Sequence, residues 1–159
     1  MSDIIYLTLQ GQKQGLISAG CSSYDSIGNR YQSEHADEIL VYSTNYDISR
    51  QQNVSHAPFI LTKADDKSSP LLLTAISHNE ILDCEFKFYR IDKSGGLLHY
   101  KTIKLSKASI IRIANEHPNS LLNNELQPFE MVSLRYESIT INHIAASTSG
   151  YSITQKAVK

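Results

Sequence analysis

The sequence predicts a mainly β protein, a compact β-barrel of two packed antiparallel sheets with one flanking α-helix at about residues 69–82. Short runs rich in β-branched and aromatic residues recur along the chain, separated by polar turns. Only one segment carries apolar residues at the spacing of an amphipathic helix. A length of 159 residues with 41% hydrophobic residues suits one domain with a sizeable core. We therefore expect a single domain over residues 1–159, with seven or eight strands.

The expected strands follow from this composition and from their turns. They are residues 4–9, 39–44, 46–49, 56–63, 84–91, 98–105 and 132–141. The run GQKQG after the first strand and Gly95-Gly96 before residue 98 predict hairpin turns. Alternation along the following segment predicts one shared buried face for Ile103, Leu105, Ile111 and Ile113. Between Tyr136 and Ile139 the apolar positions change parity, which predicts a β-bulge.

The helix is predicted by a polar run that leads into three leucines, in FILTKADDKSSPLLLTA (59–75). Its apolar residues recur at steps of three and four along one helical face: Leu72, Ala75 and Ile76. Ser69 is the expected N-cap and Pro70 the first helical residue. Asp65 and Asp66 lie near the positive end of the helix dipole, and adjacent carboxylates are typical of solvated loop charge. We interpret the run as a helix start and not as an active site.

Other parts of the chain show little periodicity. Two long polar loops are expected, at 22–38 and 115–130, and the segment 142–159 is a weakly patterned C-terminal tail. Long ordered loops in compact domains are often functional. The motif STSGYS (147–152) resembles a nucleophilic serine motif, but no base lies near it, so a turn is expected there.

Composition excludes several classes of function. Fifteen basic and sixteen acidic residues give a net charge of −1, without the basic excess typical of nucleic-acid binding. No stretch is long enough for a membrane span, and Asp3 interrupts the place of a basic signal-peptide start. Synthesis in the cytoplasm is therefore expected, and export would require a dedicated machine. Cys21 and Cys84 are expected to be buried free thiols.

No motif predicts catalysis, a cofactor or a metal. None of the six histidines pairs with another His or a Cys at zinc-site spacing. The nearest cluster consists of His78, Glu80, Asp83 and Cys84. We interpret it as polar residues that keep the helix end soluble, together with one buried thiol. Carboxylates that only the fold brings together remain possible. Nine tyrosines and no tryptophan favour contact surfaces, although tyrosine also suits half-buried strands.

Several separated segments resemble the Hcp family, the haemolysin-coregulated proteins of bacterial type VI secretion systems. The matching runs are YDSIGN, ISRQQNVSH, NVSHAPFILTKADDKSSPLLLTA, CEFKFYRI, QPFEMVSLRYESIT and STSGYS, from about Asp3 to Ser152. Two departures bear on how the C-terminus docks. Ile141 stands where the family commonly has tryptophan, and the end SITQKAVK lacks the usual aromatic and acidic residues.

The resemblance implies a β-barrel with one flanking helix, similar to phage tail-tube proteins. It also implies hexameric rings that stack head-to-tail into a hollow tube. A contractile sheath drives this tube, capped by a spike and seated on a baseplate, and small effectors can ride in the lumen. The protein would be exported without a signal peptide.

Within this resemblance, an extended loop reaches the neighbouring ring, and the segment from Tyr24 to Tyr46 is expected to be that element. The candidate self-assembly contacts lie in or beside the loop: Tyr31, Gln32, Glu34, His35, Tyr42 and Tyr46. Two alternatives stay open, a monomeric binding module with the same barrel and an enzyme whose site forms only in three dimensions.

Overall fold

The computed structural model describes residues 3–122 and 127–154, and these contain eleven strands and two α-helices. The strands are β1 (Ile4–Gly11), β2 (Gly15–Leu16), β3 (Ile39–Asn45), β4 (Ile48–Arg50), β5 (Val54–His56), β6 (Phe59–Ala64), β7 (Leu82–Ile91), β8 (Leu97–Glu116), β9 (Phe129–Arg135), β10 (Ser138–His143) and β11 (Thr148–Ile153). The helices are α1 (Tyr24–Ile27) and α2 (Ser69–Ser77), with 3-10 turns at Gly28–Arg30 and Ser33–His35.

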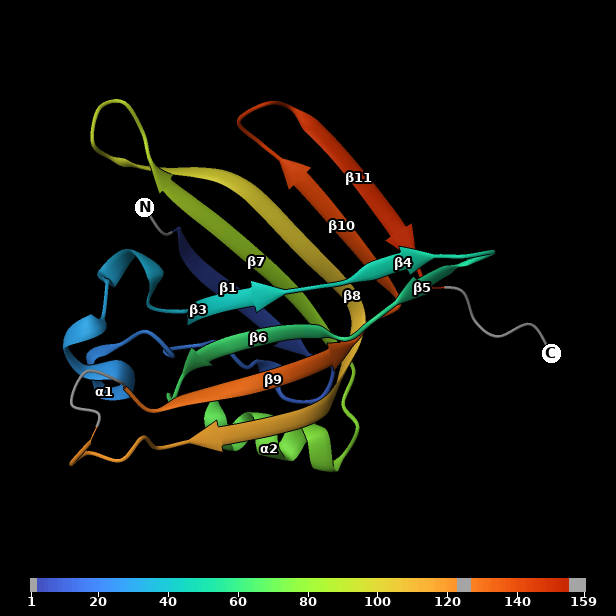
Figure 1. Ribbon diagram of the computed structural model, residues 1–159. Coiled ribbons are helices and arrows are strands. Elements are labelled where there is room, and N and C mark those ends of the chain that lie inside the picture. The colour runs from blue at the N-terminus through green and yellow to red at the C-terminus, as the bar shows by residue number, and fades with distance from the viewer. Residues whose placement is uncertain (1–2, 123–126, 155–159) are drawn as a thin grey trace.

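Nine strands form one antiparallel sheet that closes on itself, and β4 and β5 form a separate hairpin (Figure 1). The strand order is β11-β10-β8-β7-β1-β3-β6-β9, with β2 paired to β1, and a further pairing of β8 with β9 closes the ring. Strand β8 makes this possible because its first half pairs with β10 and its second half with β9. The mainly β, barrel-like fold is therefore confirmed.

The core fills the inside of this ring. Side chains from alternate strand positions point inward, and the large buried ones include Leu7, Phe59 and Phe86. Helix α2 lies beside β8, with Leu72 and Ala75 buried against the core. The helical face predicted from spacing is thus the face that packs.

The helix bounds differ from those expected. Helix α2 ends at Ser77 instead of about residue 82, because Asn79 adopts a left-handed backbone (φ 49°) and Leu82 already begins β7. Ser69 is the first helical residue, so Ser68 holds the N-cap position and Pro70 is the second residue of the helix. The helix thus starts one residue earlier than predicted.

The shared buried face predicted between residues 103 and 113 is wrong at Ile111. Ile103 is 1% exposed, whereas Ile111 is 39% exposed and Ile110 is buried instead. The buried positions change parity between Leu105 and Ala108, where the register of β8 against β7 shifts and Lys107 adopts a left-handed backbone (φ 49°).

The C-terminal part also differs from the prediction. The segment expected as one bulged strand at 132–141 is two strands, β9 and β10, interrupted after Arg135. The run STSGYS, expected as a turn, contributes most of strand β11, which pairs with β10. Residues 123–126 of the expected second loop and 155–159 of the expected tail lie outside the described residues.

Candidate functional site

Five of the six predicted contact residues lie on the surface. Tyr31 is 50% exposed, and Tyr42 and Tyr46 on and beside β3 are each 41% exposed. Gln32 and Glu34 are also exposed, in the segment between α1 and β3. Large exposed aromatic rings are enriched where proteins meet other proteins.

Tyr31 and Tyr42 belong to a tyrosine patch, which we define as Tyr24, Arg30, Tyr31 and Tyr42. The rings of Tyr24 and Tyr31 meet edge to face with centroids 5.9 Å apart. The guanidinium of Arg30 donates a hydrogen bond to the Tyr42 hydroxyl, which joins the segment 22–38 to β3. Tyr24, which is 61% exposed, was not among the predicted contacts.

His35 lies inside the protomer, unlike the other five residues. Its side chain is buried, its ring stacks on Tyr6 with centroids 4.0 Å apart, and its Nδ1 lies 2.8 Å from Glu38 Oε1. Burial, and next the charge of Glu38, raise the pKa of Tyr6. The assembly contact predicted at His35 stays untested, and a ring buried in this way offers little surface to a partner.

The two ends of the segment 22–38 are joined by hydrogen bonds, and His35 packs the segment against Tyr6 of β1. The Ser22 amide donates to the Ala36 carbonyl at 3.1 Å, and the Gly20 amide donates to the Asp37 carboxylate at 2.9 Å. The Ser22 hydroxyl also bonds to the Glu38 carbonyl. These bonds close the ends of the segment on each other.

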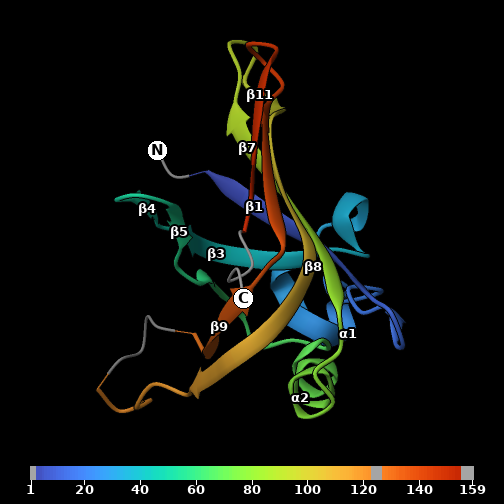
Figure 2. The same ribbon diagram turned by 90° about the vertical axis from the view of Figure 1, so that its right-hand side faces the viewer.

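The β4–β5 hairpin projects from the barrel (Figures 1 and 2). Its tip residues Arg50, Gln51, Gln52 and Asn53 are all exposed. At its base the Ala57 amide donates to the Asp47 carbonyl at 2.9 Å, which fixes where the hairpin leaves the body. The sequence predicts the element that reaches the neighbouring ring at residues 24–46 instead. The hairpin itself could have been recognised by its polar tip RQQN, which lies between two short apolar runs.

Strand β11 forms one end of the sheet among the described residues, and it pairs there only with β10. Tyr151 and Ile153 on this strand are 76% and 56% exposed. The β10–β11 hairpin and the β7–β8 hairpin extend beyond the barrel in the same direction (Figures 1 and 2). An unpaired strand edge presents backbone N–H and C=O groups that another strand can pair with.

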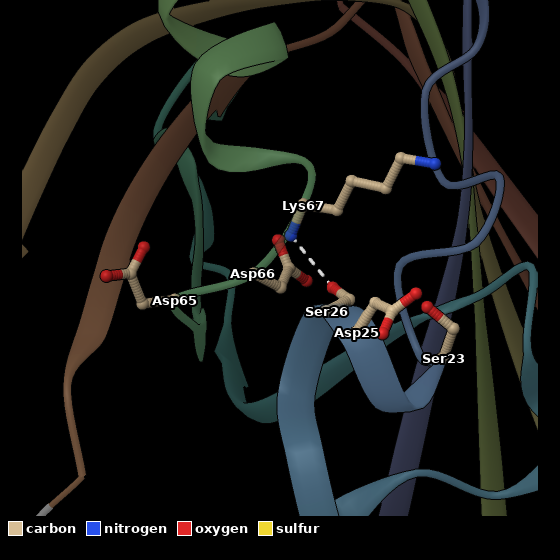
Figure 3. A pocket seen from close by; sticks show the side chains of 6 residues that line it. All are labelled: Ser23, Asp25, Ser26, Asp65, Asp66 and Lys67. Atoms are coloured by element: carbon tan, nitrogen blue, oxygen red, sulfur yellow. Dashed lines mark hydrogen bonds between the residues drawn. The ribbon is translucent and has the colours of Figure 1, made fainter.

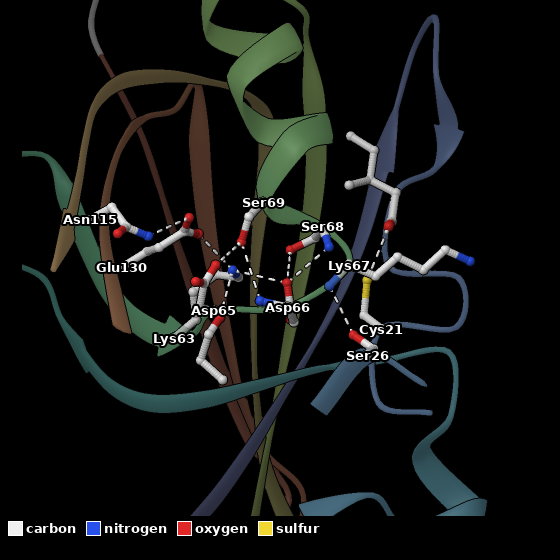
Figure 4. Close-up of polar contacts among 12 residues, drawn as sticks. Cys21, Ser26, Lys63, Asp65, Asp66, Lys67, Ser68, Ser69, Asn115 and Glu130 are labelled. Carbon is white, nitrogen blue, oxygen red and sulfur yellow. Dashed lines mark hydrogen bonds and ion pairs between the residues drawn. The ribbon is translucent and has the colours of Figure 1, made fainter. Parts of the chain in front are cut away.

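Asp66 is a buried ion-pair partner, so the interpretation of Asp65-Asp66 as solvated loop charge is wrong for this residue. The Lys63 ammonium lies 3.1 Å from Asp66 Oδ1 and 2.8 Å from Glu130 Oε2 (Figure 4). The Asn115 amide donates to the other Glu130 oxygen at 3.1 Å. This buried ion cluster of Lys63, Asp66 and Glu130 links β6 and β9 to the start of α2.

The serines beside the two aspartates serve the same local structure. The Ser68 amide and hydroxyl both donate to Asp66 Oδ1, and the Ser69 hydroxyl donates to Asp65 Oδ1 at 2.9 Å. These hydroxyls are held by carboxylates that themselves shape the turn, so they are not placed as nucleophiles next to a base.

An open pocket of about 600 Å³ lies between α1 and the start of α2, lined by Ser23, Asp25, Ser26, Asp65, Asp66 and Lys67 (Figure 3). The Lys67 amide donates to the Ser26 hydroxyl at 2.8 Å, which connects the two segments. Among residues 3–122 and 127–154, no group of three His, Cys, Asp or Glu side chains could hold a metal ion. The pocket is lined by carboxylates, but its lining residues do not include a nucleophile that is paired with a base.

Glu80 also differs from its interpretation as helix-end solubility. It is 3% exposed, and its carboxylate accepts from the backbone amides of Lys13 and Gln14 at 3.0 and 2.8 Å. Burial alone would raise its pKa, but the hydrogen bonds from Gln14 and Lys13 outweigh burial and lower it. Glu80 therefore holds the β1–β2 turn closed.

Both cysteines are free and buried, as expected. Burial, and next the charge of Asp66, raise the pKa of Cys21 to about 12. Burial raises the pKa of Cys84 as well. Because the thiolate is the reactive form, neither thiol is activated at neutral pH.

Comparison with known proteins identifies the family. The family described as "Type VI secretion system effector, Hcp" matches residues 6–143. The chain belongs to the Hcp family. The "Major exported protein" of Pseudomonas aeruginosa is 35% identical to this Hcp chain over 94% of each. A solved "Crystal structure of Hcp protein" is 34% identical, with a TM-score of 0.93 over 98% of this chain and all of the other.

The Hcp chain is also similar to part of a longer relative. "Uncharacterized protein YhhZ" of Escherichia coli K12 is 40% identical over 93% of this chain, which spans only 37% of that relative's length. The Hcp family assignment rests on the family match over residues 6–143 and on the Pseudomonas aeruginosa relative, of which this chain covers 94%. Among the described residues, no helix has both the length and the apolar character needed to cross a membrane.

Proposed function

We propose that this Hcp protein is a structural subunit of the type VI secretion tube, and not an enzyme. Its protomers form hexameric rings, and the rings stack head-to-tail into a hollow tube. The observation that carries the proposal is an Hcp barrel with a projecting β4–β5 hairpin and with a strand β11 that, among the described residues, pairs only with β10.

The lateral contact of a ring uses the β11 edge. Pairing of this edge with a strand of the next protomer satisfies its backbone groups and covers Tyr151 and Ile153, which are exposed in the single chain. A contact between two different surfaces can close into a ring, because each protomer offers one surface and receives the other. Ring closure makes the last contact intramolecular, so weak interfaces support one another.

The contact between rings uses the β4–β5 hairpin. Its polar, exposed tip is suited to hydrogen bonding across a wet interface. Segment 22–38, which carries most of the tyrosine patch, lies on the other side of the barrel (Figures 1 and 2), as a head-to-tail contact requires. Tyr31, Gln32, Glu34, Tyr42 and Tyr46 remain proposed contacts between rings, together with Tyr24. A head-to-tail contact of this kind can repeat without limit.

The other partners follow from the family. A contractile sheath surrounds the tube, a spike caps it, a baseplate starts it, and small protein effectors occupy its lumen. The subunit is made in the cytoplasm and leaves the cell with the tube. Secretion is supported by the name of the Pseudomonas aeruginosa relative, "Major exported protein".

Electron microscopy of stained particles tests this function with two variants. Wild type is expected to show rings and short stacks. Tyr151→Glu places a charge at the β11 edge and is expected to reduce ring number, while Gln51→Glu with Gln52→Glu keeps rings but separates stacks. Rings and stacks that survive both changes unaltered would contradict the assignment of these surfaces.

A further inference from the structure

A small pocket of about 150 Å³ lies where the β4–β5 hairpin joins the barrel. Three segments far apart in the sequence meet there, at the ends of β5, β9 and β11. The lining residues are His56, Ala57, Pro58, Arg135, Tyr136 and Thr154.

Two buried polar atoms of the lining residues have no hydrogen-bond partner among residues 3–122 and 127–154. They are the Tyr136 hydroxyl and His56 Nδ1. Tyr136 is only 4% exposed, so its hydroxyl is shielded from bulk solvent. Because buried polar groups are nearly always paired in folded proteins, these two atoms are available to a polar partner in the pocket.

The two side chains are held in place by their surroundings. His56 Nε2 lies 2.8 Å from the Ser152 hydroxyl, and the His56 ring meets the Tyr136 ring edge to face at 5.5 Å. The Thr154 hydroxyl donates to the Tyr136 carbonyl at 2.9 Å, which ties the end of β11 to this corner. The donors are therefore fixed before any ligand arrives.

The charge of the pocket selects the ligand class. Arg135 forms no ion pair within the described part of the chain, and no carboxylate lines the pocket. The nearest carboxylate in sequence, Glu137, lies 3.7 Å from the Lys107 ammonium instead. Burial, and next Tyr46, raise the pKa of Tyr136, so its hydroxyl keeps the proton that it donates.

We propose that this pocket binds a carboxylate group through Arg135, Tyr136 and His56. One guanidinium matches one negative charge, and its planar N–H groups match two carboxylate oxygens. The hydroxyl and the imidazole supply further donors, and the volume admits a small monocarboxylate or the end of an acidic side chain. The carboxylate has two sources, a free small molecule or an acidic residue of a second copy of this chain.

Fluorine NMR of trifluoroacetate with the purified protein, at constant ionic strength, tests the first source. The probe resonance should broaden saturably, and acetate should reverse the broadening. Arg135→Gln and Tyr136→Phe should each weaken binding about tenfold, since a hydrogen bond to a charged group is lost. Arg90→Gln removes an exposed guanidinium on β7 and should leave binding unchanged.

The mass of each variant by light scattering tests the second source, and this arm alone rests on the proposed assembly. If the wild type leaves the probe sharp while Arg135→Gln and Tyr136→Phe lower the mass and Arg90→Gln does not, a neighbouring copy supplies the carboxylate. Broadening that is equal in wild type and Arg135→Gln overturns the proposal. So does a sharp probe with unchanged masses, provided that circular dichroism shows all variants folded.

Discussion

Glu80 supplies, with one side chain, the acceptors for two backbone amides of a single turn. Its carboxylate reaches from the end of α2 to the β1–β2 turn and accepts two backbone amides and the Gln14 side-chain amide. The approach is so close that a Cβ added to Gly11 would lie 2.1 Å from Glu80 Oε2. Gly11 is therefore required by space and not by backbone torsion.

The substitution Gly11→Ala should displace the Glu80 carboxylate and leave buried amides unpaired. We expect a loss of about 1–3 kcal/mol in the free energy of unfolding, measured by urea denaturation at fixed protein concentration. Gly96→Ala is the matched control, because a Cβ there meets nothing closer than 3.8 Å. Equal midpoints for the two variants would show that Glu80 does not depend on the space at Gly11.

The buried ion cluster of Lys63, Asp66 and Glu130 is a second feature decided by single residues. Lysine on a strand that reads FILTKA is expected to face water, yet Lys63 is fully buried. Nothing in the sequence pairs it with Glu130, which lies 67 residues further along the chain. Long-range pairs of this kind arise only when the barrel closes, so periodicity could not predict them.

Lys63→Met should leave two buried carboxylates without a counter-charge. The expected cost is about 3–5 kcal/mol in the free energy of unfolding, because both charges stay desolvated. Lys104→Met, at an exposed position on β8, removes the same charge and should change stability by no more than about 0.5 kcal/mol. A Lys63→Met protein as stable as this control would contradict the structural role of the cluster.

At the scale of elements, the helix and the strands with a regular apolar face were predicted well. The weakly patterned strand and the register shift were not. Helix α2 and strands β1, β3 and β7 lie close to the predicted ranges, because each has one strongly apolar face. Strand β11 was missed since five of its six residues are exposed and no face is apolar. The change of parity in β8 depends on a register shift against β7, which local sequence does not encode.

Helix α2 offers an internal comparison between neighbouring leucines. Leu72 is 2% exposed and Leu73 is 64% exposed. Leu72→Ala should leave a cavity and cost about 2–5 kcal/mol, while Leu73→Ala should stay within about 0.5 kcal/mol. Thermal and urea unfolding of the two variants measure this difference, and equal losses would mean that the helix packs by another face.

At the scale of the whole molecule, the family could be predicted from separated sequence segments, whereas the assembly contacts stay a prediction. The polar segment 22–38 looked extended because it lacks periodicity, but its two ends bind each other and it folds onto the barrel. The hairpin that does project is short and was divided between two expected strands. Five predicted contacts are exposed because tyrosine and polar residues mark surface, while His35 is held inside by a ring stack that sequence does not reveal.

The proposed function depends on self-assembly of the barrel. Light-scattering mass after size exclusion, over a wide range of protein concentration, measures this property. Six protomers of 17.8 kDa give about 107 kDa. We expect a stable species of this mass that persists on dilution. A species of about 18 kDa at every concentration would contradict it, and would favour a monomeric binding module built on the Hcp barrel.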